Sequence, residues 1–192
     1  MEKVKLAVFV TGGGTNCENI IRHFQGSTSV AVEIVVSSRA DAYAITRAKN
    51  LGVPVTVITR QQLNEEPDLA LEAVKGCDYI ILAGFLPKVP LYLIERFPNR
   101  IINIHPALLP KFGGKGMWGH HVHEAVKAAG ETESGITIHY VNAELDEGEP
   151  IAQFSTPLSP DDTPDDIAAK VHELEMKHFP EVIEQVVTGS NK

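Results

Sequence analysis

The strongest constraint on the fold is the short stretch 101–106, which is apolar except for two polar side chains and ends in a proline. Its three β-branched isoleucines predict a buried strand, and Pro106 ends that strand because it has no N–H to donate to a sheet. Side chains alternate along a strand, so Asn103 and His105 leave it on the same face. Ligands of open α/β sheets bind at the carboxyl ends of strands, which makes this strand end a candidate site.

The rest of the chain alternates apolar strands with amphipathic helices, which predicts an α/β fold. We expect a mostly parallel, Rossmann-like sheet flanked by helices, with an antiparallel C-terminal hairpin and a long C-terminal helix. The expected strands are 4–10, 30–36, 54–58, 77–85, 101–105 and the hairpin 134–141 with 151–157. The expected helices are 17–24, 42–51, 63–75 with Leu69, Leu71 and Val74 buried, 90–97, 122–129, and one from the capping pair Thr163 and Asp166 to about Val187.

The segment Thr11–Asn16, which contains three consecutive glycines, connects the first strand to the first helix. Strand, glycine loop and helix together are typical of phosphate binding, because glycines let backbone N–H groups approach an anion at the positive end of a helix. The loop matches neither the dinucleotide pattern Gly-x-Gly-x-x-Gly nor a Walker loop. A tight turn without a ligand is the alternative, and the loop alone does not decide between the two.

Composition and charge exclude several classes of protein. The 192 residues, 43% of them hydrophobic, suit one domain with a single large core, and the net charge of −8 argues against a general nucleic-acid surface. Cys17 and Cys77 form no disulfide framework or zinc pattern. No apolar run is long enough to span a bilayer. We therefore expect a cytoplasmic protein. Three histidines at 120, 121 and 123 suggest a metal, but no carboxylate accompanies them at a fixed spacing, so no metal is expected.

The segment 103–110, Asn-Ile-His-Pro-Ala-Leu-Leu-Pro, resembles the signature Asn-Ile-His-Pro-x-x-Leu-Pro of the 10-formyltetrahydrofolate-dependent formyltransferases. Three further motifs follow the order of that family, so the resemblance covers about residues 4 to 188. The glycine loop resembles that of members that act on glycinamide ribonucleotide, although Thr11 stands where Ser is usual. The resemblance implies transfer of a formyl group from 10-formyltetrahydrofolate to the amino group of glycinamide ribonucleotide, in purine biosynthesis.

The resemblance also implies roles for individual residues. Asn103, His105 and Asp146, the last in an Asp-x-Gly segment, are the implied catalytic residues. The implied substrate-binding residues are Gly12, Gly13, Gly14, Thr15, Asn16 and Glu175. The implied folate-binding residues are Leu86, Pro87, Lys88, Val89, Asn103, Asn142, Ala143, Glu144 and Leu145. Within a single domain, residues 1–100 would hold the nucleotide phosphate and residues 101–192 would carry catalysis and folate. His139 is expected to pack structurally.

Formyl transfer to an amine passes through a tetrahedral intermediate whose oxyanion needs donors already in place. Asn103 offers an amide N–H, and protonated His105, a form favoured by a carboxylate such as that of Asp146, offers a second donor. Two other functions remain open: hydrolysis of the same formyl donor, and a ligand-binding module without catalysis. Nothing in the sequence decides between a monomer and a homodimer.

Overall fold

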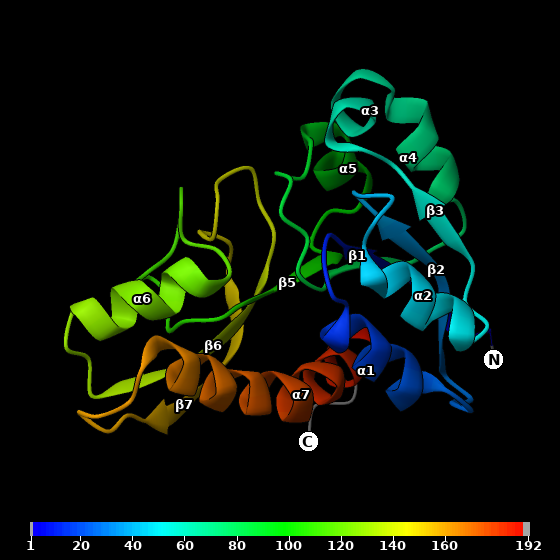
Figure 1. Ribbon diagram of the computed structural model, residues 1–192. Helices are drawn as coiled ribbons and strands as arrows, with labels where there is room; N and C mark the ends of the chain where they lie inside the picture. Colours follow the sequence, from blue (N-terminus) through cyan, green and yellow to red (C-terminus); the bar gives the residue numbers. More distant parts are fainter. Residues whose placement is uncertain (1, 190–192) are drawn as a thin grey trace.

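A computed structural model describes residues 2–189, which fold around one seven-stranded sheet (Figure 1). The strand order is β3-β2-β1-β4-β5-β6-β7. The strands are β1 (Val4–Val10), β2 (Val30–Ser37), β3 (Val55–Val57), β4 (Tyr79–Leu82), β5 (Ile101–His105), β6 (Glu133–Tyr140) and β7 (Pro150–Pro157). Strands β1 to β5 are parallel, whereas β6 is antiparallel to both β5 and β7. The predicted fold class is confirmed.

Helices cover both faces of the sheet. They are α1 (Thr15–Phe24), α2 (Tyr43–Asn50), α3 (Arg60–Glu65), α4 (Pro67–Ala73), α5 (Leu91–Arg96), α6 (His120–Ala128) and α7 (Pro164–Thr188). Helices α1, α2, α6 and α7 share one core with the side chains of Leu6, Val8 and Val10 on β1. Helices α3, α4 and α5 share the opposite core with Ala7 and Phe9, as the alternation along a strand requires.

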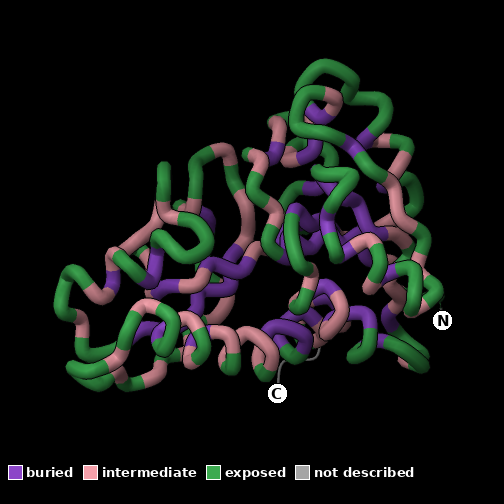
Figure 2. The backbone as a smooth tube through the Cα atoms, viewed as in Figure 1, coloured by how far each residue is buried: buried purple, intermediate pink, exposed green. Residues whose placement is uncertain are grey.

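The two cores lie against the strands, and Figure 2 shows the buried residues gathered there, with exposed residues in the outer loops. In β5, Ile102 and Ile104 belong to the first core and Ile101 to the second. Asn103 and His105 therefore share the face of Ile101. The polar side chains of β5 thus lie on the face opposite to α6 and α7.

One helix was predicted incorrectly. The expected helix 63–75 is divided into α3 and α4, which meet at Glu66 and Pro67. Proline disfavours helical conformation in the residue before it and lacks the N–H that a continuous helix needs, so Pro67 instead begins α4. The break also changes which side chains face the core, because Val74 is buried while Leu69 is 41% exposed.

Helix α7 crosses the molecule beside α6, β6 and α1. It begins as predicted, because the Thr163 hydroxyl accepts from the Asp166 N–H and the Asp166 carboxylate accepts from the Thr163 N–H, at 3.2 and 2.8 Å. Its contact with α1 brings two distant parts of the chain together. The Asn16 amide donates to the Glu175 carboxylate at 2.9 Å.

Candidate active site

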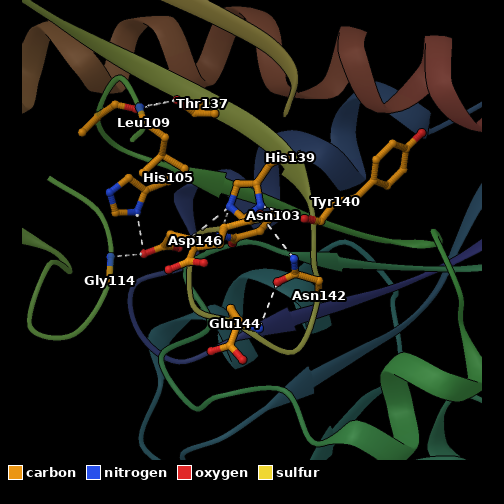
Figure 3. A network of polar contacts seen from close by, with 12 residues as sticks. Asn103, His105, Leu109, Gly114, Thr137, His139, Tyr140, Asn142, Glu144 and Asp146 are labelled. Atoms are coloured by element: carbon orange, nitrogen blue, oxygen red, sulfur yellow. Dashed lines mark hydrogen bonds and ion pairs between the residues drawn. The ribbon is translucent and has the colours of Figure 1, made fainter. Parts of the chain in front are cut away.

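The candidate site is a polar cluster on adjacent strands β5 and β6 (Figure 3). In this antiparallel pair, Asn103 lies opposite His139 and His105 lies opposite Thr137. Directly opposed residues point to the same face, so four polar side chains meet on one surface of the sheet. The Thr137 hydroxyl donates to the Ala107 carbonyl at 2.8 Å, which ties the segment after β5 to β6.

His139 determines how Asn103 is oriented. Its Nδ1 lies 2.8 Å from the Tyr140 carbonyl, which only accepts, so Nδ1 carries a proton. Burial lowers the pKa of His139 below its ordinary value of 6.5, so the ring is neutral at pH 7 and Nε2 is an acceptor. Nε2 lies 3.1 Å from the Asn103 amide nitrogen, which donates to it. One amide N–H of Asn103 is therefore committed to His139, and the second remains.

The expectation that His139 only packs structurally is therefore incomplete. His139 is 2% exposed, as a packing residue would be, but both of its nitrogens have polar partners and one partner is Asn103. The pairing follows from strand register, and the register of two antiparallel strands separated by residues 106–132 is not evident from sequence alone. The alternation within β6 was the only available signal, since it places His139 and Thr137 on one face.

Asp146 approaches the same cluster from the β6–β7 loop. One of its carboxylate oxygens accepts from the Gly114 N–H at 2.9 Å and lies 3.6 Å from His105 Nδ1. The other oxygen lies 3.8 Å from His139 Nε2. Asp146 has a φ of 57°, a left-handed conformation in which Asp and Asn are enriched. The proximity of Asp146 to His105, implied by the resemblance, is present in the structure.

The loop that carries Asp146 is held close to β6 at Gly148. A Cβ added to Gly148 would lie 1.6 Å from the Tyr140 carbonyl oxygen, so any larger residue would force the loop away. The Asp-x-Gly spacing noted in the sequence thus has a physical reason. Its glycine allows the close approach that places the aspartate beside the imidazoles.

His105 is nearly buried and has two differently placed nitrogens. Its Nε2 lies 2.7 Å from the Phe112 carbonyl and donates to it. Its Nδ1 faces Asp146 at 3.6 Å, which is longer than a hydrogen bond and leaves both groups able to contact a third partner. The side chains of His105 and Asp146 are 5% and 15% exposed, so charge at this site is weakly screened by water.

A cavity of about 410 Å³ joins this cluster to the rest of the candidate site. Asn103, His105, His139 and Asp146 line it, and so do Asn16 and Glu175. Eight of the nine expected folate-binding residues line it: Leu86, Pro87, Lys88, Val89, Asn103, Asn142, Glu144 and Leu145; Ala143 does not. The expected substrate-binding residues are divided. Asn16 and Glu175 line the cavity, whereas Gly12, Gly13, Gly14 and Thr15 lie outside its lining.

The cavity also has wall residues outside the expected site residues. The glycine-rich loop 114–119 contributes Met117 and the half-exposed ring of Trp118. Leu86 and Leu145 are likewise unusually exposed for large apolar side chains. Exposed apolar side chains on the rim of a cavity that also holds convergent polar groups are typical of a ligand-binding site.

The three histidines at the start of α6 are unlike one another. His120 and His121 are exposed and lie near the Glu124 carboxylate, whereas His123 is buried. Burial also lowers the pKa of His123. Among residues 2–189, no group of three or more His, Cys, Asp or Glu side chains is arranged to hold a metal ion.

Comparison with known proteins shows the family to which the chain belongs. The profile of the formyl transferase family matches residues 4–183, nearly the whole chain. The chain belongs to the formyl transferase family. The chain is 40% identical over 186 residues to the chloroplastic phosphoribosylglycinamide formyltransferase of Arabidopsis thaliana, covering 93% of this chain and 64% of that protein. It thus spans slightly less than two thirds of that plant relative.

Bacterial relatives match over more of their own length. The phosphoribosylglycinamide formyltransferase of Haemophilus influenzae is 34% identical over 192 residues, covering 96% of this chain and 88% of that protein. The crystal structure of phosphoribosylglycinamide formyltransferase from Anaplasma phagocytophilum superimposes with a TM-score of 0.88 at 30% identity, covering 100% of this chain and 90% of that chain. The corresponding structure from Streptococcus pneumoniae gives 0.83 at 35% identity, covering 97% and 99%.

Proposed function

We propose that this formyl transferase moves the formyl group of 10-formyltetrahydrofolate to the amino group of glycinamide ribonucleotide, in purine biosynthesis. The products are formylglycinamide ribonucleotide and tetrahydrofolate. The observation that carries the proposal is the convergence of Asn103, His105 and Asp146 on one cavity that Asn16, next to the glycine loop, also lines. The relatives named above support the choice of substrates.

The proposed reaction needs no covalent intermediate with the protein. The substrate amine attacks the formyl carbon, a C–N bond forms, and the formyl oxygen becomes an oxyanion. The remaining N–H of Asn103 donates to that oxygen, and protonated His105 donates to it from Nδ1 while its Nε2–H stays on the Phe112 carbonyl. The bond from carbon to N10 of the folate then breaks.

A proton must move from the attacking amine to the departing N10 during this step. Asp146 is the proposed organiser of that transfer, either directly or through a water molecule. Its carboxylate is held by the Gly114 N–H and lies near both imidazoles, so its position is fixed before substrates arrive. Such fixed charge in a mostly buried site stabilises developing charge without reorganisation.

The proposed placement of the substrates follows the two ends of the cavity. The nucleotide phosphate would bind the loop Gly12–Asn16, and its ribose would bind Glu175, which already contacts Asn16. The folate would lie along 86–89 and 142–145, under the apolar rim of Leu86, Trp118 and Leu145. Both halves of the chain, 1–100 and 101–192, contribute to this arrangement.

We also propose that the protein works in a reducing, cytoplasm-like compartment and without a metal. Its two cysteines are free, and burial raises the pKa of Cys17 to about 12 and that of Cys77 to about 11, so neither is a ready nucleophile. Among residues 2–189, no helix is long and apolar enough to cross a membrane.

The test is to mix the protein with 10-formyltetrahydrofolate, with and without glycinamide ribonucleotide, and to follow folate absorbance. Release of tetrahydrofolate only in the presence of the nucleotide is the expected result. Release without nucleotide would instead support hydrolysis of the donor, and no release in either case would support a binding module. Asn103→Ala serves as the catalytic control, and we expect it to lower turnover by about 10²–10³.

A further inference from the structure

The glycine loop rests against helix α2, and two of its carbonyl groups are held there. The Ala44 N–H donates to the Gly12 carbonyl at 3.1 Å. The Arg47 guanidinium donates from Nε to the Gly13 carbonyl at 2.8 Å. Two successive peptide groups of the loop are therefore fixed by residues of one helix.

Fixing these carbonyls also fixes the N–H groups of the same peptides. A trans peptide is planar, and its N–H points opposite to its C=O. Because the carbonyls of Gly12 and Gly13 point toward α2, the N–H groups of Gly13 and Gly14 point away from it. Across residues 2–189, neither N–H has a hydrogen-bond acceptor. Two unpaired N–H groups that point away from α2, just before a helix, are suited to an anion.

Arg47 is itself held on three sides. Its guanidinium also donates to the Glu18 carboxylate, and its Cζ lies 4.9 Å from the centre of the Tyr43 ring. Glu18 bonds Arg22 as well, and hydrogen bonds from Arg22 and Arg47 lower the pKa of Glu18, so it is ionised at neutral pH. Two guanidinium groups and one carboxylate give this cluster a net charge of +1, in a chain whose net charge is −8.

We propose that Arg47 is a positioning residue for the nucleotide substrate: by holding the Gly13 carbonyl against α2, it orients the loop N–H groups toward the substrate's phosphate. This inference rests on the proposed function and adds a residue to it. Arg47 lies 31 residues after Asn16, on a different helix, and neither borders the cavity nor reaches Asn103. Its effect is therefore on binding of one substrate and not on the chemical step.

The role predicts a specific kinetic pattern. Arg47→Met removes both hydrogen bonds but keeps an apolar stem of similar length, and the 29% exposed side chain leaves no buried cavity behind. We expect the KM for glycinamide ribonucleotide to rise about tenfold, as expected for lost hydrogen bonds to a charged group. The turnover number and the KM for 10-formyltetrahydrofolate should stay within about twofold. Arg47→Lys should recover only part of the lost affinity. Its ammonium keeps the charge but lacks the guanidinium fork that reaches both the Gly13 carbonyl and Glu18.

Arg22 provides a matched control. It bonds the same Glu18 carboxylate, at 2.8 and 3.0 Å, but makes no contact with the loop. Arg22→Met therefore removes one positive charge from the same ion-pair network and should leave the KM for the nucleotide unchanged. An equal rise in KM for Arg22→Met and Arg47→Met would overturn the positioning role, because net charge alone would then explain it. So would an equal loss in all three kinetic constants of Arg47→Met, which would indicate general damage.

Direct binding separates this inference from the proposed function. Ribose 5-phosphate, measured by calorimetry, should bind the unmodified protein and bind Arg47→Met about tenfold more weakly. If ribose 5-phosphate binds both proteins equally, the role of Arg47 is wrong while the proposed function stands. If formyl transfer is absent but the difference in ribose 5-phosphate binding is present, the proposed function fails and the role of Arg47 stands. If ribose 5-phosphate binds neither protein, the role of Arg47 is also refuted.

Discussion

The two ring nitrogens of His139 allow its role to be tested with a pair of isosteric substitutions. His139→Asn keeps a donor near the position of Nδ1 and so retains the contact with the Tyr140 carbonyl. His139→Gln keeps an acceptor near the position of Nε2 and so retains the contact with Asn103. The two variants each remove one of the two hydrogen bonds, at 2.8 and 3.1 Å. Comparing the two variants therefore separates the effect of the hydrogen bond to the Tyr140 carbonyl from the effect of the hydrogen bond to Asn103.

The expected magnitude follows from the single hydrogen bond to Asn103. A neutral hydrogen bond contributes about 0.5–1.5 kcal/mol, which corresponds to a factor of about 2–13 in rate if it is lost only from catalysis. We therefore expect His139→Asn to lower turnover by up to about tenfold. His139→Gln should lower it less. Both effects should be smaller than that of Asn103→Ala, which removes the oxyanion donor itself.

Single-turnover formyl transfer, with both substrates saturating, is the appropriate assay because it measures the chemical step. The double variant Asn103→Ala/His139→Asn should be no slower than Asn103→Ala alone, because His139 acts through Asn103. Equal rates for the Asn and Gln variants would refute this reasoning. So would a fully additive loss in the double variant.

Three further predictions follow from the same structure. Burial lowers the pKa of His139, so below about pH 6.5 the unfolded chain binds more protons than the folded protein, and stability falls as the pH drops. Between pH 7.5 and 5, the thermal midpoint of His139→Gln should therefore fall less than that of the unmodified protein. Gly14→Ala should lower the free energy of unfolding, measured with denaturant, by about 2–4 kcal/mol, because φ is 77° and the new Cβ would lie 2.4 Å from Ala44 Cβ. Gly12→Ala is the control: its new Cβ meets nothing within 4 Å, so the free energy of unfolding should hardly change. Trp118, the single tryptophan, lines the cavity, so saturating tetrahydrofolate should change its fluorescence emission, and an unchanged spectrum would place the folate elsewhere.

Much of the fold was evident from the sequence, because strand and helix periods differ and the buried strands are continuously apolar. The segment 101–105 was predicted as a strand and forms β5 with those bounds. The prediction of one helix over 63–75 was wrong because it followed the amphipathic spacing and gave too little weight to Pro67. A proline inside a helical pattern is a strong sign that the helix breaks there.

The site was only partly evident, because catalytic geometry depends on contacts between distant segments. Alternation along β5 placed Asn103 and His105 on one face, but only a resemblance indicated Asp146. The distance of 3.6 Å between Asp146 and His105 depends on the course of the β6–β7 loop. The pairing of His139 with Asn103 depends on strand register, which local sequence does not encode.

The central claim is that Asn103, His105 and Asp146 act together on the formyl group, and Asp146→Asn tests it most directly. Asn tolerates the left-handed conformation at φ 57°, and its amide oxygen still accepts from the Gly114 N–H, so the loop should keep its position. Removing the charge should lower the single-turnover rate of formyl transfer by about 10² or more while the affinities for both substrates change little. A rate within about threefold of that of the unmodified protein would contradict the account.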